Sequence, residues 1–244
     1  MLIETHQTQN LSRAVRLMLA CGVIGPLLFI LVFLIEDATR PFYSPWRNMV
    51  SSLSLSSQGW VQIVSFLICG ALVLCFAVGL RQVLRSGKGA VWGPRLLFVF
   101  GLSLLIAGIF VTDPGQGYPP GSAGSAQTLH GTIHGMNAPL AFGSLTAAIV
   151  VLARRAAADP AQRGWAWYSY ISAVLFVASF IASLAVAVLG EKGVLPNAPA
   201  GLLERVAIII GWSWIALLAM QLLQQMRQPG PAAAPRTGGH PGSR

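Results

Sequence analysis

The chain has 244 residues, of which 55% are hydrophobic and 9% are charged, and its formal net charge is +9. An ordinary soluble domain carries about 25% charged residues, which it needs for its surface. The composition therefore excludes a soluble globular domain, and the chain must bury its apolar residues in a membrane.

Six long windows contain no charged residue. They cover residues 17–35, 48–80, 96–112, 114–153, 164–190 and 206–226. A helix that crosses the hydrocarbon core needs about 20 apolar residues, so each window can hold one span. The windows lack the period-two alternation of membrane strands. The sequence predicts an all-α fold, a polytopic transmembrane bundle of six helices.

The basic residues predict the orientation of the bundle. With the N-terminus inside, the inner segments hold 12 of the 16 Lys and Arg residues and the outer segments hold four. This is the positive-inside bias, and it predicts that both termini lie in the cytoplasm. The basic charge is therefore a topology signal, and we expect no nucleic-acid partner. The lipid bilayer is the expected environment, in a multi-pass protein of the prokaryotic cytoplasmic (plasma) membrane.

The expected elements begin with a polar, loose tail at residues 1–12, and a single transmembrane domain follows at 13–227. Its helices are expected at 13–35, 58–81, 93–113, 128–153, 165–189 and 202–226. The first helix lacks a cleavage site after its apolar run, so we expect an uncleaved span rather than a signal peptide. The Pro/Gly/Ala-rich segment 228–244 is expected to be disordered.

The loop after the first helix carries the most unusual run of the chain. From Arg47 onward, the polar residues Asn48, Ser51 and Ser52 are interspersed with apolar ones. This pattern favours a segment that dips into the mouth of the bundle with its backbone buried against protein. The alternative is an ordinary N-cap for the second helix, which serines supply readily.

Acidic residues stand where helices one and three end. Glu36 and Asp37 close the first helix, and Asp113 closes the third. A helix C-terminus favours cations, so each of these carboxylates needs a compensating positive group. For Asp113, the compensating positive group would be a histidinium or Arg47.

The fourth helix opens with His130 and His134, which are four residues apart and share one face, and Asn137 extends that face inward. Two imidazoles at this spacing can hold a divalent metal such as zinc, with Asp113 or Glu36 as a third ligand or as a base. The alternatives are hydrogen bonding to loop backbone or water, proton handling, and ligand binding.

Glu204 and Arg205 open the sixth helix, where a glutamate interacts favourably with the helix dipole. Helix capping with a local ion pair and a role in ligand binding are both open. Together the polar set predicts an outward-facing pocket. Its candidate residues are Arg47, Asn48, Ser51, Ser52, Asp113, His130, His134, Asn137, Glu204 and Arg205.

The six spans, the run Arg47–Ser54, Asp113-Pro114 and the His130/His134 pair resemble a prokaryotic family of integral membrane proteins, domain of unknown function 998. The resemblance covers about residues 13–226. It implies a six-helix membrane protein and supplies no catalytic residues.

Three functions fit these features. The first is a protein that binds or senses a lipid headgroup, a small polar ligand or an ion. No span carries an ionisable residue at its middle, which disfavours a proton-coupled transporter. The second is a metal-dependent membrane hydrolase that acts on a lipid ester or amide. The third is an accessory subunit of a membrane complex, because small residues such as Gly22, Gly25 and Gly101 allow close helix packing. A protein partner and a homo-oligomer both stay open.

Overall fold

The computed structural model describes residues 2–122 and 126–226, with side chains from Arg13 onward. Its elements are α1 (Leu2–Thr39), η1 (Val50–Ser54), α2 (Trp60–Val83), α3 (Trp92–Ile109), α4 (Leu129–Ala156), η2 (Pro160–Gln162), α5 (Arg163–Glu191) and α6 (Ala200–Gln225). The described residues form no strand, and six helices are long and apolar enough to cross a membrane. The predicted all-α fold with six spans is confirmed.

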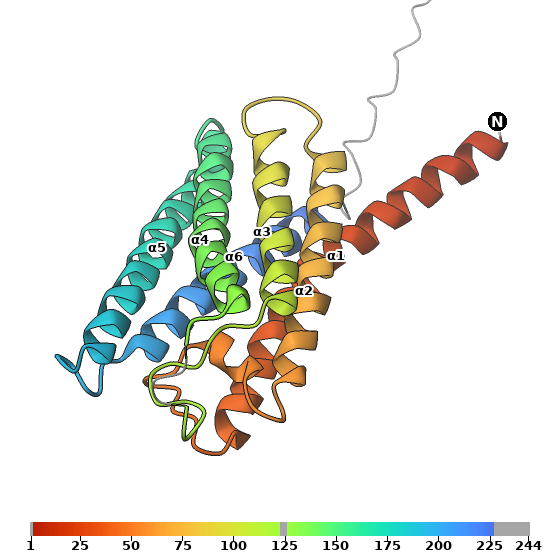
Figure 1. Cartoon of the computed structure of the whole chain (residues 1–244). Helices are drawn as coiled ribbons and strands as arrows, with labels where there is room; N and C mark the ends of the chain where they lie inside the picture. The colour runs from red at the N-terminus through yellow and green to blue at the C-terminus, as the bar shows by residue number, and fades with distance from the viewer. Residues whose placement is uncertain (1, 123–125, 227–244) are drawn as a thin grey trace, which may run out of the picture.

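The helix ends lie within a few residues of the predicted ones, with one clear difference. The first helix begins at Leu2, so the backbone of the polar segment expected to be loose continues α1. Figure 1 shows this first part of α1 projecting beyond the bundle. The predicted disordered tail at 228–244 lies outside the described residues.

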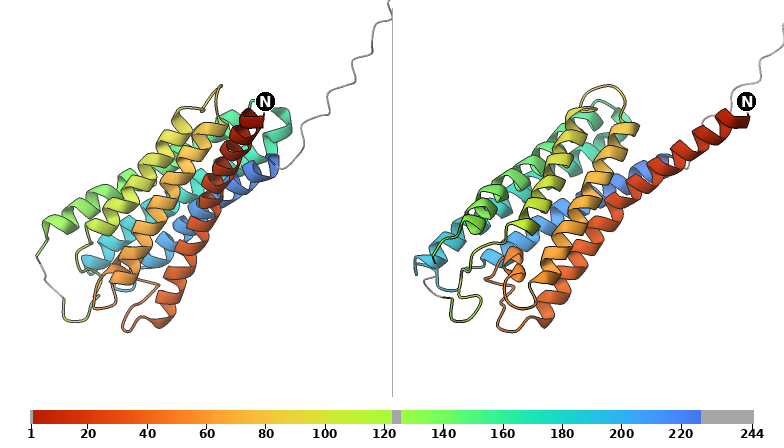
Figure 2. Two further views of the ribbon diagram at one scale, coloured as in Figure 1. Left: turned by 90° about the vertical axis from the view of Figure 1, so that its right-hand side faces the viewer. Right: turned by 45° about the vertical axis from the view of Figure 1, so that its right-hand side comes forward.

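The six helices form a closed ring (Figures 1 and 2). Each helix packs against its neighbour in sequence, and α6 packs against α1. Glycines permit the closest of these approaches. A Cβ atom added to Gly70 of α2 would lie 3.0 Å from the carbonyl oxygen of Gly101 in α3, and Gly25 faces Leu72 of α2. These small residues therefore serve packing within the chain.

The ring buries an aromatic core and turns aliphatic side chains outward. Phe29 and Phe33 of α1 and Phe76 of α2 are almost fully buried. Leu27 and Leu31 of α1, in contrast, are more than half exposed, as expected for side chains that face lipid. The chain is therefore an integral membrane protein with six spans.

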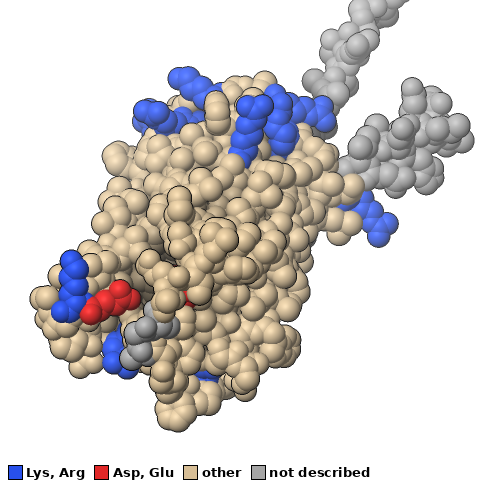
Figure 3. Space-filling model, viewed as in Figure 1, with Lys and Arg blue, Asp and Glu red and all other residues tan. Residues whose placement is uncertain are grey.

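The two ends of the bundle differ in charge. At one end α1, α3 and α5 finish and α2, α4 and α6 begin, and this acidic end holds five of the chain's seven acidic residues: Glu36, Asp37, Asp113, Glu191 and Glu204. At the opposite, basic end, Lys and Arg side chains gather around the α2–α3 and α4–α5 turns (top of Figure 3). Which end faces the cytoplasm stays a prediction from the positive-inside bias.

Cysteine labelling tests the orientation. In a background in which Cys21, Cys69 and Cys75 are replaced by alanine, we expect Lys192→Cys at the acidic end to react with a membrane-impermeant maleimide in intact cells. Lys88→Cys at the basic end is the matched control, since both lysines are exposed. It should react only after the membrane is opened. The reverse pattern would show that the acidic end faces the cytoplasm.

Candidate functional site

Arg205 of α6 holds the acidic end together. Its Nε and Nη2 atoms donate to Asp37 Oδ2 and Oδ1 of α1 at 2.7 and 2.6 Å, which is a two-pronged ion pair with both side chains largely buried. Its other hydrogen bonds, each 2.9 Å or shorter, reach the carbonyl oxygens of Pro45, Asn48 and Gly201 and the hydroxyl of Tyr43. All three guanidinium nitrogens are therefore engaged, and Arg205 is a structural hub.

Tyr43 extends this hub into the loop after α1. Its hydroxyl accepts from Arg205 and donates to the carbonyl oxygen of Met49 at 2.7 Å. Burial raises the pKa of the Tyr43 hydroxyl well above its ordinary value, so the hydroxyl keeps its proton and can donate. The segment between Tyr43 and Met49 is thus fixed against α6.

Asn48 joins two loops. Its Oδ1 accepts from the backbone N–H of Ser44 at 2.8 Å, and its Nδ2 donates to the carbonyl oxygen of Gln116 at 3.1 Å. The side chain is 1% exposed and lines neither of the two hollows described below. Asn48 therefore contributes to the site by holding the loops in place.

The serine-rich run forms η1, which lies across the acidic end of the ring. Val50 and Leu53 of η1 are buried, as the prediction of a segment dipping into the bundle mouth requires. The alternative of an N-cap for the second helix is wrong, because the N-cap of α2 is Gly59 and no side chain caps it. Ser52 is also buried and lines neither hollow.

Glu204 of α6 forms a hydrogen bond with the first residue of η1. Its Oε2 accepts from the backbone N–H of Val50 at 2.6 Å, at the start of η1. Among the described side chains, Glu204 forms no ion pair, and Arg205 pairs with Asp37 instead. The predicted local ion pair between Glu204 and Arg205 is therefore wrong. Adjacent residues on a helix point in different directions, so a partner from another helix is favoured.

Glu36 is compensated by Arg40, one turn further along the chain. The two form a buried ion pair, and Arg40 also donates to Ser56 Oγ at 2.9 Å and to the carbonyl oxygen of Gln58 at 3.2 Å. Both acids at the end of α1 thus have an arginine partner, as the helix-dipole argument required.

Asp113 is compensated by the N-terminus of α4 rather than by a histidine or Arg47. Its Oδ2 accepts from the backbone N–H of Thr128 at 2.9 Å, and its Oδ1 accepts from Thr128 Oγ1 at 2.6 Å. Thr128 Oγ1 in turn accepts from the N–H of Gly131 at 3.0 Å, as an N-cap residue does. The carboxylate therefore links the end of α3 to the positive end of α4's dipole.

The two histidines occupy different environments. His134 is buried, and its Nδ1 lies 2.8 Å from the carbonyl oxygen of Phe110. His130 is exposed and packs against the ring of Phe110 with the centroids 5.3 Å apart. Among the described residues, no three His, Cys, Asp or Glu side chains are grouped so that they could hold a metal ion. The geometry gives no support to a metal site at His130, His134 and Asp113, and that site stays a prediction.

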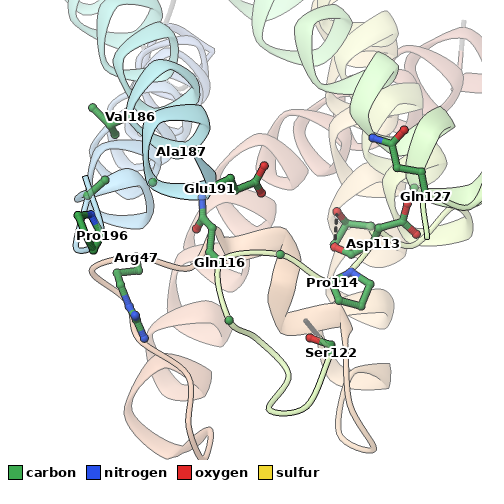
Figure 4. Close-up of a pocket in the computed structure, with 16 residues that line it drawn as sticks. Arg47, Asp113, Pro114, Gln116, Ser122, Gln127, Val186, Ala187, Glu191 and Pro196 are labelled. Atoms are coloured by element: carbon green, nitrogen blue, oxygen red, sulfur yellow. Dashed lines mark hydrogen bonds between the residues drawn. The ribbon is translucent and has the colours of Figure 1, made fainter. Parts of the chain in front are cut away.

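The acidic end is hollowed by an outer pocket of about 670 Å³. Figure 4 shows Gln116 and Glu191 on one side of this pocket and Asp113 and Gln127 on the other. Arg47 also belongs to the lining, as predicted for a polar pocket. The outer pocket thus presents both signs of charge and several amide groups.

An inner cavity of about 220 Å³ lies in the middle of the ring, and all six helices and η1 contribute to it. Its polar lining residues include Ser51, Ser103, His134, Asn137 and Glu204. Aromatic side chains also line the cavity, and among them the ring of Trp212 stacks on that of Phe29 with the centroids 4.7 Å apart. The inner cavity adjoins the outer pocket, because Thr112 lines both.

Two buried polar atoms in the wall of the inner cavity have no partner. Asn137 Nδ2 donates to the carbonyl oxygen of Ser103 at 2.8 Å, but Asn137 Oδ1 and Ser103 Oγ form no hydrogen bond. Ser103 is 1% exposed and Asn137 is 7% exposed. Buried polar groups are nearly always satisfied, so unsatisfied ones beside a cavity indicate a place for a ligand or water.

Sequence reasoning missed Tyr43, Ser103 and Thr112. Ser103 lies in an apolar window, where a serine is unremarkable, and only the facing Asn137 marks it. Tyr43 lies near the acids of α1, but nothing in the sequence connects it to α6. These contacts depend on how the helices are arranged, which a single sequence does not give.

The chain belongs to the family described as protein of unknown function (DUF998), whose model matches residues 23–221. This confirms the resemblance noted from the loop run and the histidines. No match to the chain was found among curated proteins or among solved structures.

The cap of α4 gives a test of the geometry at Asp113. A Cβ atom at Gly131 would collide with the Asp113 carboxylate, whereas one at Gly135, a turn later, would meet nothing within 4 Å. We expect Gly131→Ala to lower the free energy of unfolding by about 1–2 kcal/mol, the cost of a lost cap. Gly135→Ala should be neutral or slightly stabilising. Thermal unfolding in detergent measures both, and equal effects of the two substitutions would contradict the capping geometry.

Proposed function

We propose that the protein binds an amphiphilic molecule at its acidic end, which faces the outside of the cell. A lipid headgroup or a small polar group occupies the outer pocket. The observation that carries this proposal is that two hollows of different character adjoin at Thr112. A pocket rich in polar groups beside a mainly apolar cavity matches a molecule with a polar head and an apolar tail.

The outer pocket suits a polar headgroup. Arg47 offers a cation that forms no ion pair among the described side chains, and Glu191 and Gln127 offer acceptors and donors. The pocket floor includes the loop 112–117, which Asn48 holds in place through Gln116. A preorganised rim of this kind lowers the ordering cost of binding.

The walls of both hollows lie partly at membrane depth, between the facing halves of α4 and α5. Gly131 of α4 and Ala187 of α5 line the outer pocket, and Gly135 of α4 and Leu184 of α5 line the inner cavity. Gly135 is exposed although it lines the inner cavity, so the cavity wall is thin here. An amphiphile in the outer leaflet can therefore approach the pocket sideways, between α4 and α5.

Filling the outer pocket tests the proposal. Ala187 lines the pocket and is buried, and the neighbouring Val188 is 48% exposed and lines neither hollow. We expect Ala187→Trp to lower the amount of phospholipid that stays bound after detergent extraction by roughly tenfold, since pocket ligands bury most of their surface. Val188→Trp, the matched control, should leave it unchanged.

Native mass spectrometry counts the retained lipids directly. The protein is extracted from vesicles of phosphatidylcholine and phosphatidylglycerol, and the mass of each adduct identifies the lipid. Wild-type protein that retains no lipid, or equal retention by the two tryptophan variants, would overturn the proposed function.

A further inference from the structure

The polar groups of the inner cavity form a set of hydrogen-bond acceptors. Nδ1 of His134 must carry a proton, because the carbonyl of Phe110 can only accept. In the neutral ring Nε2 is then an acceptor. Asn137 donates one N–H to the carbonyl oxygen of Ser103, and its amide oxygen has no partner. The hydroxyls of Ser51, Ser103 and Thr112, which also line the cavity, can both donate and accept.

Glu204 adds a carboxyl group to this set. The other carboxylates nearby are compensated: Asp37 by Arg205, Glu36 by Arg40, and Asp113 by the N-terminus of α4. Glu204 forms no ion pair among the described side chains and accepts one hydrogen bond, from the N–H of Val50. It is 7% exposed and lines the cavity. A buried carboxyl group outside an ion pair is costly to ionise unless a cation or a strong donor joins it.

The walls next to these acceptors are aromatic. Phe66 packs edge-on to His134, and Phe100 packs edge-on to Trp212, with centroids 6.5 and 5.6 Å apart. Further along the cavity, Phe142 stacks on Phe180 at 3.6 Å. Aromatic faces attract organic cations as well as apolar chains, and the attraction grows when the site is dry.

We propose that the inner cavity binds an apolar molecule that carries a protonated amine, with the ammonium group at Glu204, Asn137 and His134. Its apolar part lies among the aromatic side chains toward Trp212. The cavity of about 220 Å³ exceeds the ~150 Å³ of an apolar cavity that accepts benzene, so a short alkyl chain fits. This inference rests on the proposed function for the route of entry, and it names the chemistry of the ligand.

Two sources can supply such an ammonium group, a free alkylamine and an aminolipid. Both present N–H donors and a positive charge beside an apolar chain. A glycerol ester linkage, in contrast, offers only acceptors and cannot donate to Asn137 Oδ1 or to the carboxyl group of Glu204.

The test compares three probes with the same chain, octylamine, octanol and octanoate, by native mass spectrometry of the full-length protein in a neutral detergent. We expect octylamine to bind tightest and octanoate weakest. Glu204→Gln keeps the shape and can still accept from Val50, and it should weaken octylamine binding by roughly tenfold or more. Its effect on octanol should be small. Asp159→Asn, an acid-to-amide change at the basic end, is the control with the same change in net charge and should have no effect.

A second pair of variants keeps the test decisive if Glu204→Gln fails to fold. Ala141 lines the cavity, and the adjacent Leu140 is 51% exposed and lines neither hollow. Ala141→Phe should abolish octylamine binding, whereas Leu140→Phe should not. Octanoate binding as tightly as octylamine would overturn the inference. Octylamine binding that Glu204→Gln leaves unchanged would also overturn it, as would unchanged binding in Ala141→Phe if Glu204→Gln does not fold.

The source of the amine follows from a competition. Phosphatidylethanolamine in phosphatidylcholine nanodiscs should displace octylamine if the ligand is an aminolipid, and it should not if the ligand is a free amine.

Failure of this inference can be distinguished from failure of the proposed function. If Glu204→Gln leaves octylamine binding unchanged while Ala187→Trp still loses its bound lipid, the inference alone is overturned. Equal lipid retention in Ala187→Trp and Val188→Trp, with octylamine still sensitive to Glu204→Gln, overturns the proposed function alone.

Discussion

The buried ion pair between Arg205 and Asp37 is the contact on which the acidic end depends. It joins the last helix to the first and so closes the ring on the side where the hollows lie. The same guanidinium binds the carbonyl oxygens of Pro45 and Asn48, which fixes the loop that leads into η1. An arginine can do this because its planar group carries five donors in fixed directions. Without it, Asp37 would be a buried carboxylate at a helix C-terminus, where the helix dipole opposes it.

The segment η1 connects the Arg205–Asp37 ion pair to the candidate site. The loop held by Arg205 and Tyr43 places Val50 above Glu204, and the Val50 N–H then fixes the Glu204 carboxylate at the cavity. Asn48, in the same loop, holds the loop 112–117 that forms part of the outer pocket. Neither hollow is thus defined by a single helix pair. A polar network in a low-dielectric environment is strong when each member is satisfied, and two of the buried atoms that lack a partner, Ser103 Oγ and Asn137 Oδ1, lie at the inner cavity.

Much of this arrangement could be predicted from the sequence. Hydropathy and length predict the six spans, because a bilayer requires about 20 apolar residues per helix. The helix-dipole argument correctly predicted that Asp37 and Asp113 need compensation. It could not name the partners, because Arg205 and Thr128 come from other helices. The predicted local ion pair of Glu204 with Arg205 was wrong for the same reason. The sequence does not show in which direction each side chain points, so it could not show that Arg205 faces Asp37 on another helix. His130 and His134 share a helical face, yet His130 lies in the first turn of α4 and is exposed, whereas His134, one turn further along, is buried.

A double-mutant cycle at Arg205 and Asp37 tests most directly whether this ion pair organises the acidic end. Arg205→Met leaves the Asp37 carboxylate buried and unpaired, so we expect it to lower the free energy of unfolding in detergent micelles by about 3–5 kcal/mol. Asp37→Asn combined with Arg205→Met removes both charges and should cost clearly less than the sum of the two single substitutions. Purely additive effects, or a single Arg205→Met variant as stable as the wild type, would contradict the account.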